Sequence, residues 1–142
     1  MKKLLAFTAA IVLACGFSLT ASAQSDASTE ISTAHAHALM AHGATSLDMA
    51  HTHLHHVINC LVGPKGTGFD AAAGDPCKSQ GNGAIPDSAS NAALDSKLKT
   101  ALAQAEAGLK TTDLAAAHKD AAKIAATLQS TPTQKKMGGY SW

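Results

Sequence analysis

The chain has 142 residues, with eleven lysines, ten acidic residues, eight histidines and no arginine, and its formal net charge at pH 7 is +1. A surface that binds nucleic-acid phosphates needs a basic excess that usually includes arginine, so nucleic acid is not an expected partner. The length suits one small domain, and because alanine dominates its apolar residues, helices around any core must pack closely.

The N-terminal residues predict an export signal. Met1–Lys3 is positively charged, Leu4–Leu13 is apolar and Ala21–Ala23 is a small-residue cleavage site. The apolar stretch is shorter than the roughly 20 residues of a spanning helix. We therefore expect residues 1–23 to be a signal peptide and the mature chain to be periplasmic or secreted, without a transmembrane segment. A minor alternative is a lipoprotein anchored through Cys15.

Hydrophobic periodicity predicts two helices in the part of the chain that is rich in histidine. The first covers Thr29–Ala41, and Gly43 follows it as a C-terminal cap. The second begins near Thr45–Asp48 and ends near Leu61, and its apolar face consists of Leu47, Ala50, Leu54, Val57, Ile58 and Leu61. If Gly43 is instead tolerated inside a helix, one unbroken helix covers Thr29–Leu61.

Seven of the eight histidines lie in these two helices or the turn between them. Neutral imidazole is the commonest protein ligand for first-row transition metals. Since a core does not need so many imidazoles, we predict metal binding, and the alternative is a polar helix face that uses histidine in place of glutamine. The candidate ligands are His35, His37, His42, His51, His53, His55 and His56.

The position of the predicted turn indicates which histidines share a level. With a turn centred near Ala44, antiparallel helices place His35 level with His53 and His37 level with His51, and facing helices are where bundles build metal sites. In one unbroken helix, His35 and His53 would instead lie about 27 Å apart, at about 1.5 Å per residue, and could not share an ion.

The helical angle divides the histidines of the second helix between two flanks. At about 100° per residue, His51 and His55 lie on one flank of the apolar face. His53, His56 and Cys60 lie towards the other flank. The sequence therefore predicts two shallow sites rather than one deep site.

Two cysteines, Cys60 and Cys77, remain after signal cleavage. An even pair in an exported protein predicts a disulfide, which would tie the loop 63–86 that is rich in glycine and proline. The alternative makes Cys60 a metal ligand, because it lies four residues after His56 on one helix face.

Two further helices are predicted after this loop. One begins near Asp87 or Ser88 and ends near Ala107, and the other begins near Asp113 and ends before Pro132. The last helix carries His118, a weaker candidate ligand.

These elements predict an all-α fold. We expect a four-helix bundle of two helical hairpins joined by a long disulfide-tied loop. The bundle domain would cover residues 24–133, and residues 134–142 would form a flexible tail.

The composition also restricts the metal and the chemistry. Few carboxylates accompany the histidines, which favours copper, zinc or nickel over calcium, magnesium or manganese. The chain has too few glutamates for a di-iron carboxylate site, and no spacing indicates a catalytic nucleophile, so we do not expect an enzyme. Binding should weaken as pH falls from about 7 to about 5, because a protonated imidazole does not coordinate a metal.

The pattern A-H-G-x-x-S-x-D-x-A-x-x-H, which runs from Ala41 to His53 and is repeated in weaker form, resembles the small periplasmic histidine-rich metal-binding proteins. The resemblance implies a four-helix bundle that binds several divalent ions, copper notably, without catalysis. This chain departs from the family by its two cysteines and the loop between them.

The sequence thus predicts a periplasmic transition-metal binding protein that buffers, scavenges or delivers copper, or else zinc or nickel, through a histidine-rich hairpin. Two alternatives remain open: a non-catalytic helical interaction module of the cell envelope, with a protein partner that the sequence does not identify, and a bundle that binds haem non-covalently.

Overall fold

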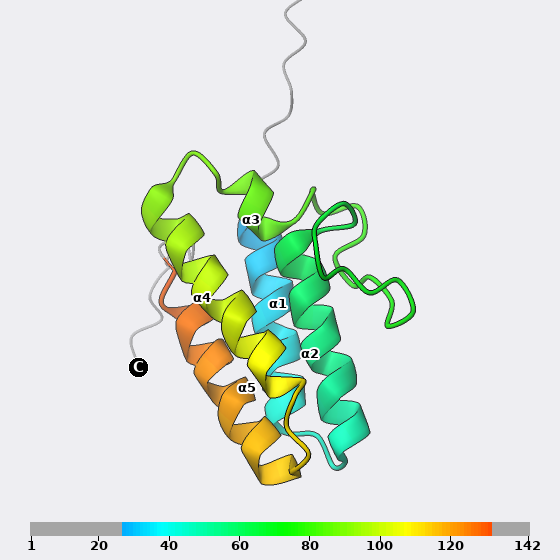
Figure 1. The fold of residues 1–142 in the computed structure, drawn as a ribbon. Coiled ribbons are helices and arrows are strands. Elements are labelled where there is room, and N and C mark those ends of the chain that lie inside the picture. The colour runs from blue at the N-terminus through cyan, green and yellow to red at the C-terminus, as the bar shows by residue number, and fades with distance from the viewer. Residues whose placement is uncertain (1–26, 132–142) are drawn as a thin grey trace, which may run out of the picture.

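The computed structural model describes residues 27–131, so the predicted signal peptide 1–23 and tail 134–142 lie outside the described residues. Within this range the chain forms helices and no strand, which confirms the all-α prediction. The helices are α1 (Ala27–His42), α2 (Leu47–Val62), α3 (Ala84–Asp87), α4 (Ala92–Gly108) and α5 (Leu114–Gln129). The four long helices lie side by side, and a long connection between α2 and α3 runs along the outer side of α2 (Figure 1). Within residues 27–131, no helix combines the length and the apolar character needed to cross a bilayer.

Residues 29–61 form two helices, and the alternative of one unbroken helix is wrong. The chain leaves α1 after His42 and enters α2 at Leu47. Ser46 has an extended backbone, with φ −143° and ψ 157°, and its side chain accepts a hydrogen bond from the backbone N–H of Met49. This N-cap satisfies a donor that has no partner inside the helix, so a new helix starts there.

The start of the third long helix differs from the prediction. It begins at Ala92 and not at Asp87 or Ser88, because the preceding residues form the short helix α3 and a turn. Asn91 is extended, and its side chain accepts from the backbone N–H of Leu94, so Asn91 is the cap of α4. The predicted loop 63–86 therefore ends in helical structure that the sequence analysis missed.

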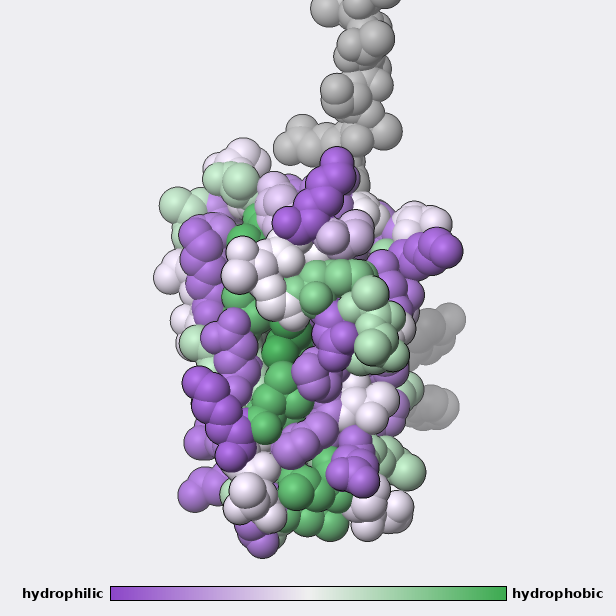
Figure 2. Space-filling model, turned by 45° about the vertical axis from the view of Figure 1, so that its right-hand side comes forward, coloured by the Kyte–Doolittle hydropathy of each residue, from purple (hydrophilic) through white to green (hydrophobic). Residues whose placement is uncertain are grey.

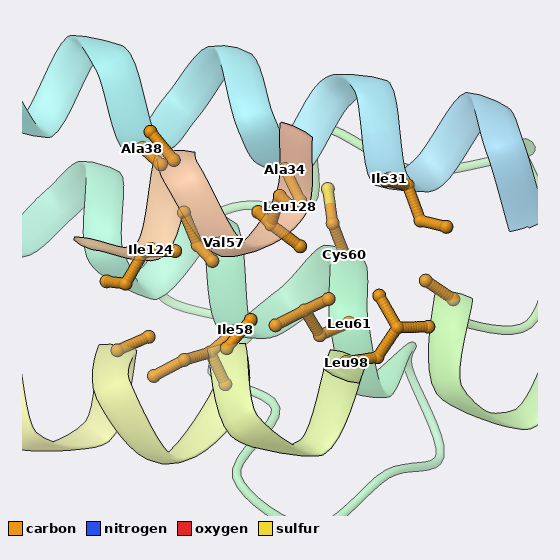
Figure 3. Close-up of a cluster of buried hydrophobic side chains, with 14 of the residues drawn as sticks. Ile31, Ala34, Ala38, Val57, Ile58, Cys60, Leu61, Leu98, Ile124 and Leu128 are labelled. Atoms are coloured by element: carbon orange, nitrogen blue, oxygen red, sulfur yellow. The ribbon is translucent and has the colours of Figure 1, made fainter. Parts of the chain in front are cut away.

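The core is built from a few large aliphatic side chains and many alanines. α1 contacts α2 and α5, and α4 contacts α5 and α2. Figure 3 shows aliphatic side chains of the long helices pointing toward one another. The largest fully buried aliphatic residues are Ile31, Leu54, Val57, Leu61, Leu98, Ile124 and Leu128. Alanines fill the closest approaches of the helices, and Ala34, Ala38, Ala41, Ala101, Ala105, Ala117 and Ala121 have no exposed surface.

The predicted disulfide between Cys60 and Cys77 is present, with a Cα–Cα distance of 5.2 Å. Both residues are buried. The alternative of Cys60 as a metal ligand is therefore wrong, because its sulfur is bonded to Cys77. The disulfide joins the last turns of α2 to the long connection, as the sequence analysis expected.

Glu30 ties the start of α1 to the end of the same connection. Its side chain is 1% exposed, and its Oε1 accepts a hydrogen bond of 2.8 Å from the backbone N–H of Gly83. Burial raises the pKa of the Glu30 carboxyl group to about 7. The hydrogen bond from Gly83 opposes this shift, whereas the acidic groups of Asp87 and Asp75 add to it.

We predict that replacing both Cys60 and Cys77 by alanine lowers the free energy of unfolding by about 3 kcal/mol, because the open chain gains conformational entropy in the unfolded state. Thermal unfolding followed by circular dichroism checks this. An unchanged midpoint would show that the loop needs no covalent tie.

The raised pKa of Glu30 predicts a dependence of stability on pH. A carboxyl group whose pKa rises from 4.5 unfolded to about 7 folded destabilises the fold progressively as pH rises through this range. Glu30→Gln keeps an acceptor for Gly83 and removes this penalty. It should therefore stabilise the protein by roughly 3 kcal/mol more at pH 8 than at pH 4.5, measured by urea unfolding. Glu106→Gln removes an exposed carboxyl group and is the matched control. Equal effects of Glu30→Gln at both pH values would contradict the prediction.

Candidate metal centre

Three histidines from α1 and α2 converge on one point. His37, His53 and His56 each place a ring nitrogen within 4.8 Å of the other two. The Nδ1 atoms of His37 and His53 are 3.1 Å apart, so one donates a hydrogen bond to the other, and the tautomers decide which. The ring of His56 lies edge-on to that of His37, with centroids 4.6 Å apart. All three side chains are half-buried.

The helix geometry explains why these residues meet. The buried face of α1 contains Ala34, Ala38 and Ala41, and His37 borders this face on the side of α2. His53 and His56 are three residues apart on α2 and therefore share one flank of that helix. The predicted division of the α2 histidines between two flanks agrees with this arrangement.

Burial and repulsion from neighbouring imidazoles favour the neutral forms of His37 and His53. Desolvation, followed by repulsion from the neighbouring His56 and His53, lowers the pKa of His37 to about 4, because two adjacent imidazolium ions repel each other. Desolvation, followed by His56, also lowers the pKa of His53. At neutral pH these two ligands need not lose a proton before they bind a metal.

The loop determines the tautomer of His56. Its Nε2 donates a hydrogen bond of 2.7 Å to the backbone carbonyl of Ala73, and a carbonyl oxygen only accepts. The neutral ring therefore carries its proton on Nε2. Its Nδ1 is buried and has no hydrogen-bond partner among the described residues, so a lone pair is left for a ligand. Metal-binding histidines characteristically donate their second ring N–H to a carbonyl or carboxylate in this way.

The distance between the first two nitrogens fits a shared ion. With metal–nitrogen bonds of about 2.05 Å, two ligands are about 2.9 Å apart at a right angle and about 3.3 Å apart at a tetrahedral angle. The observed 3.1 Å between His37 and His53 lies between these values. The third nitrogen, from His56, lies within 4.8 Å of both. An ion bound between the rings would replace the proton now shared by His37 and His53.

The register between the helices differs from the prediction. His37, and not His35, lies opposite His53, and the predicted pairs of His35 with His53 and of His37 with His51 do not form in this cluster. The reason is the helical angle. Residues that are two positions apart on a helix are separated by about 200° around its axis, so His35 and His37 lie on opposite flanks of α1.

The other candidate ligands of α2 lie on its second flank. His55 Nδ1 is 3.3 Å from Asp70 Oδ2, which makes His55 a contact of the loop. His51 is half-buried and belongs to no group of three potential ligands among the described residues.

His42 and His118 meet at the C-terminal end of α1. Their ring centroids are 5.9 Å apart. His42 Nδ1 donates to the backbone carbonyl of His118 at 3.1 Å, and His118 Nε2 donates to the carbonyl of Ala44 at 2.8 Å. These hydrogen bonds connect α5 to the turn between α1 and α2, so the described geometry gives the pair a packing role.

An apolar strip runs along the face that Figure 2 displays, between hydrophilic side chains. A cavity of about 640 Å³ lies between α4, the end of α2 and the loop, with Val62, Ile85 and Leu102 among its lining residues. Its lining includes no histidine, so it is separate from the histidine cluster.

A comparison of the chain with protein-family models, with curated proteins and with solved structures finds no match. The chemistry of the histidine cluster therefore carries the functional argument.

We predict that His37 stays neutral down to about pH 4. As pH falls, the His37 ring takes up its proton in the unfolded chain near pH 6.5 but in the folded protein only near pH 4. The free energy of unfolding is therefore highest above about pH 6.5 and decreases as pH falls towards 4. Nuclear magnetic resonance of the imidazole ring protons between pH 3.5 and 8 measures this directly. A midpoint of His37 near 6.5 would mean that its ring is solvated and not held in the cluster.

Proposed function

We propose that this protein binds a transition-metal ion through His37, His53 and His56. The observation that carries the proposal is the convergence of three imidazole nitrogens within 4.8 Å. Two of these rings have pKa values held below the ordinary range, and the third has a buried nitrogen without a hydrogen-bond partner among the described residues. A cation bound here would satisfy all three nitrogens at once.

The donor set favours copper, with zinc and nickel as the other candidates. The cluster that the described residues form contains only nitrogen donors, which suit borderline metals better than calcium or magnesium. Among divalent ions copper binds nitrogen sites most tightly as a general trend, so it is the first expectation.

Exposure of the site is compatible with exchange of the ion. Three half-buried protein ligands leave at least one coordination position for water or for a ligand from another molecule. A closed structural site would have four protein ligands. We therefore propose buffering, scavenging or delivery of the metal and not catalysis or a purely structural role.

The proposed location is the periplasm or another exported compartment. An intramolecular disulfide is typical of oxidising environments. The predicted signal peptide supports the same location.

The four long helices are interpreted as a four-helix bundle of two helical hairpins, which is the architecture that the resemblance to the periplasmic histidine-rich proteins implies. The turns after α1 and after α4 are short, as in antiparallel neighbours. The cluster of imidazoles favours this function over the interaction module and over the haem-binding bundle, because neither requires three converging ring nitrogens.

We predict that the variant with His37, His53 and His56 all changed to glutamine loses most binding of Cu(II), Zn(II) and Ni(II), because each change removes one nitrogen donor. Isothermal titration calorimetry at pH 7.5 on residues 24–142 measures the affinity. Loss of at least about tenfold is expected for each metal that the wild-type protein binds.

The matched control changes His35, His51 and His55 to glutamine, which removes the same number of imidazoles from outside the cluster. It should keep nearly wild-type affinity. If the two variants bind equally well, the site is not the one that we propose.

A further inference from the structure

The long connection between α2 and α3 forms a layer over one face of α2. Four α2 residues contact residues 70–77 of the connection: His55 from one flank of the helix, His56 and Cys60 from the other, and Asn59 between them. We call residues 70–77 the capping segment. Its contact with the histidine cluster is the hydrogen bond from His56 to the carbonyl of Ala73.

A buried asparagine holds the capping segment in place. The Asn59 side chain is fully buried, and its Nδ2 donates to the backbone carbonyls of Asp70 and Gly74 at 2.7 Å each. Its Oδ1 accepts from the backbone N–H of Asp70 at 2.8 Å. These three hydrogen bonds hold the backbone before Ala73, at Asp70, and after it, at Gly74. They therefore fix the direction of the Ala73 carbonyl.

The backbone at Gly74 completes this orientation. Gly74 has a φ of 92°, a left-handed backbone conformation that residues other than glycine rarely adopt. A Cβ atom there would lie 3.8 Å from His56 Nε2. The chain therefore turns away directly after it presents the Ala73 carbonyl to the histidine.

The disulfide closes the segment at its other end. Cys60 directly follows Asn59 on α2, and Cys77 ends the capping segment. The backbone N–H of Cys77 donates to Asp75 Oδ1 at 3.0 Å, which stiffens this last turn. Asn59 and the disulfide thus fasten the segment to the helix turn that follows His56.

We propose that the capping segment sets the metal affinity of the histidine cluster by holding His56 in the tautomer with its proton on Nε2. Asn59 and the Cys60–Cys77 disulfide are then positioning groups that never touch the ion. Without the segment, the proton of His56 distributes between both nitrogens and the ring rotates more freely. This inference rests on the proposed function, since it explains how that site is tuned.

Two variants release the segment in different ways. Asn59→Leu removes the three side-chain hydrogen bonds and keeps the branching and the number of side-chain heavy atoms. The double change of Cys60 and Cys77 to alanine removes the covalent tie without leaving a thiol that could bind metal. We expect each to weaken Zn(II) binding tenfold to a hundredfold, about the effect of removing an outer partner of a metal ligand. Competition with a zinc indicator at pH 7.5 and 15 °C measures the affinity, with circular dichroism as the check on folding.

The matched control is Thr33→Ala. It removes the hydrogen bond of 3.0 Å from Thr33 Oγ1 to Gln80 Oε1, another contact of the same connection, but leaves the capping segment and His56 untouched. It should bind Zn(II) within about twofold of the wild-type protein, since no partner of a ligand changes. Wild-type affinity in folded Asn59→Leu and in the double alanine variant would overturn the proposal.

A measurement without metal separates this proposal from the proposed function. Nitrogen-15 shifts of the imidazole rings in the metal-free protein report which nitrogen of His56 carries the proton. We expect Nε2–H alone in the wild-type protein and a mixture of tautomers in both variants. A His56 protonated on Nδ1 in the wild-type protein would overturn the proposal even if neither variant folds. If the wild-type protein binds no Zn(II), Cu(II) or Ni(II), the proposed function fails, whereas the tautomer readout still tests the capping segment.

Discussion

The close packing of α1 against α2 is the constraint on which the histidine cluster depends. The buried face of α1 consists largely of alanines, among them Ala34, Ala38 and Ala41. Small side chains let two helix axes approach, since the interaxial distance follows the size of the residues at the contact. This approach brings the ring of His37 to within hydrogen-bonding distance of His53 across the two helices. The same packing removes water from the rings and so keeps them neutral.

The histidine cluster and the fold are coupled through the loop. A thin core of alanines leaves little hydrophobic stabilisation to hold a long connection rich in glycine, and small domains usually need an additional tie. Here the ties are the disulfide, the buried side chain of Asn59 and the carboxyl group of Glu30, each at a different point of the connection. Because one of these points adjoins His56, the residues that stabilise the loop also orient this histidine.

The metal-free cluster is a compromise between burial and charge. Desolvation and repulsion between neighbouring imidazoles oppose charging of His37 and His53, so the pKa values of both rings are lowered. Only one hydrogen bond satisfies the nitrogens of His37 and His53 that face each other, and Nδ1 of His56 has no partner among the described residues. A bound cation would give each of these ring nitrogens a partner, which is a physical reason for three imidazoles to lie so close together.

The sequence by itself determined the helical class, the disulfide and the density of imidazoles on two neighbouring helices. Periodicity and cap residues are local signals, so α2 and α5 could be predicted within a few residues. The start of α4 was predicted too early, because Asn91 and not Asp87 or Ser88 caps that helix. Only the tertiary structure decided that His37, and not His35, joins His53, since the register of two helices depends on side-chain packing along their whole length. It also decided the role of the Ala73 carbonyl, because a backbone group carries no signature in the sequence and becomes a partner only when the chain folds back over α2.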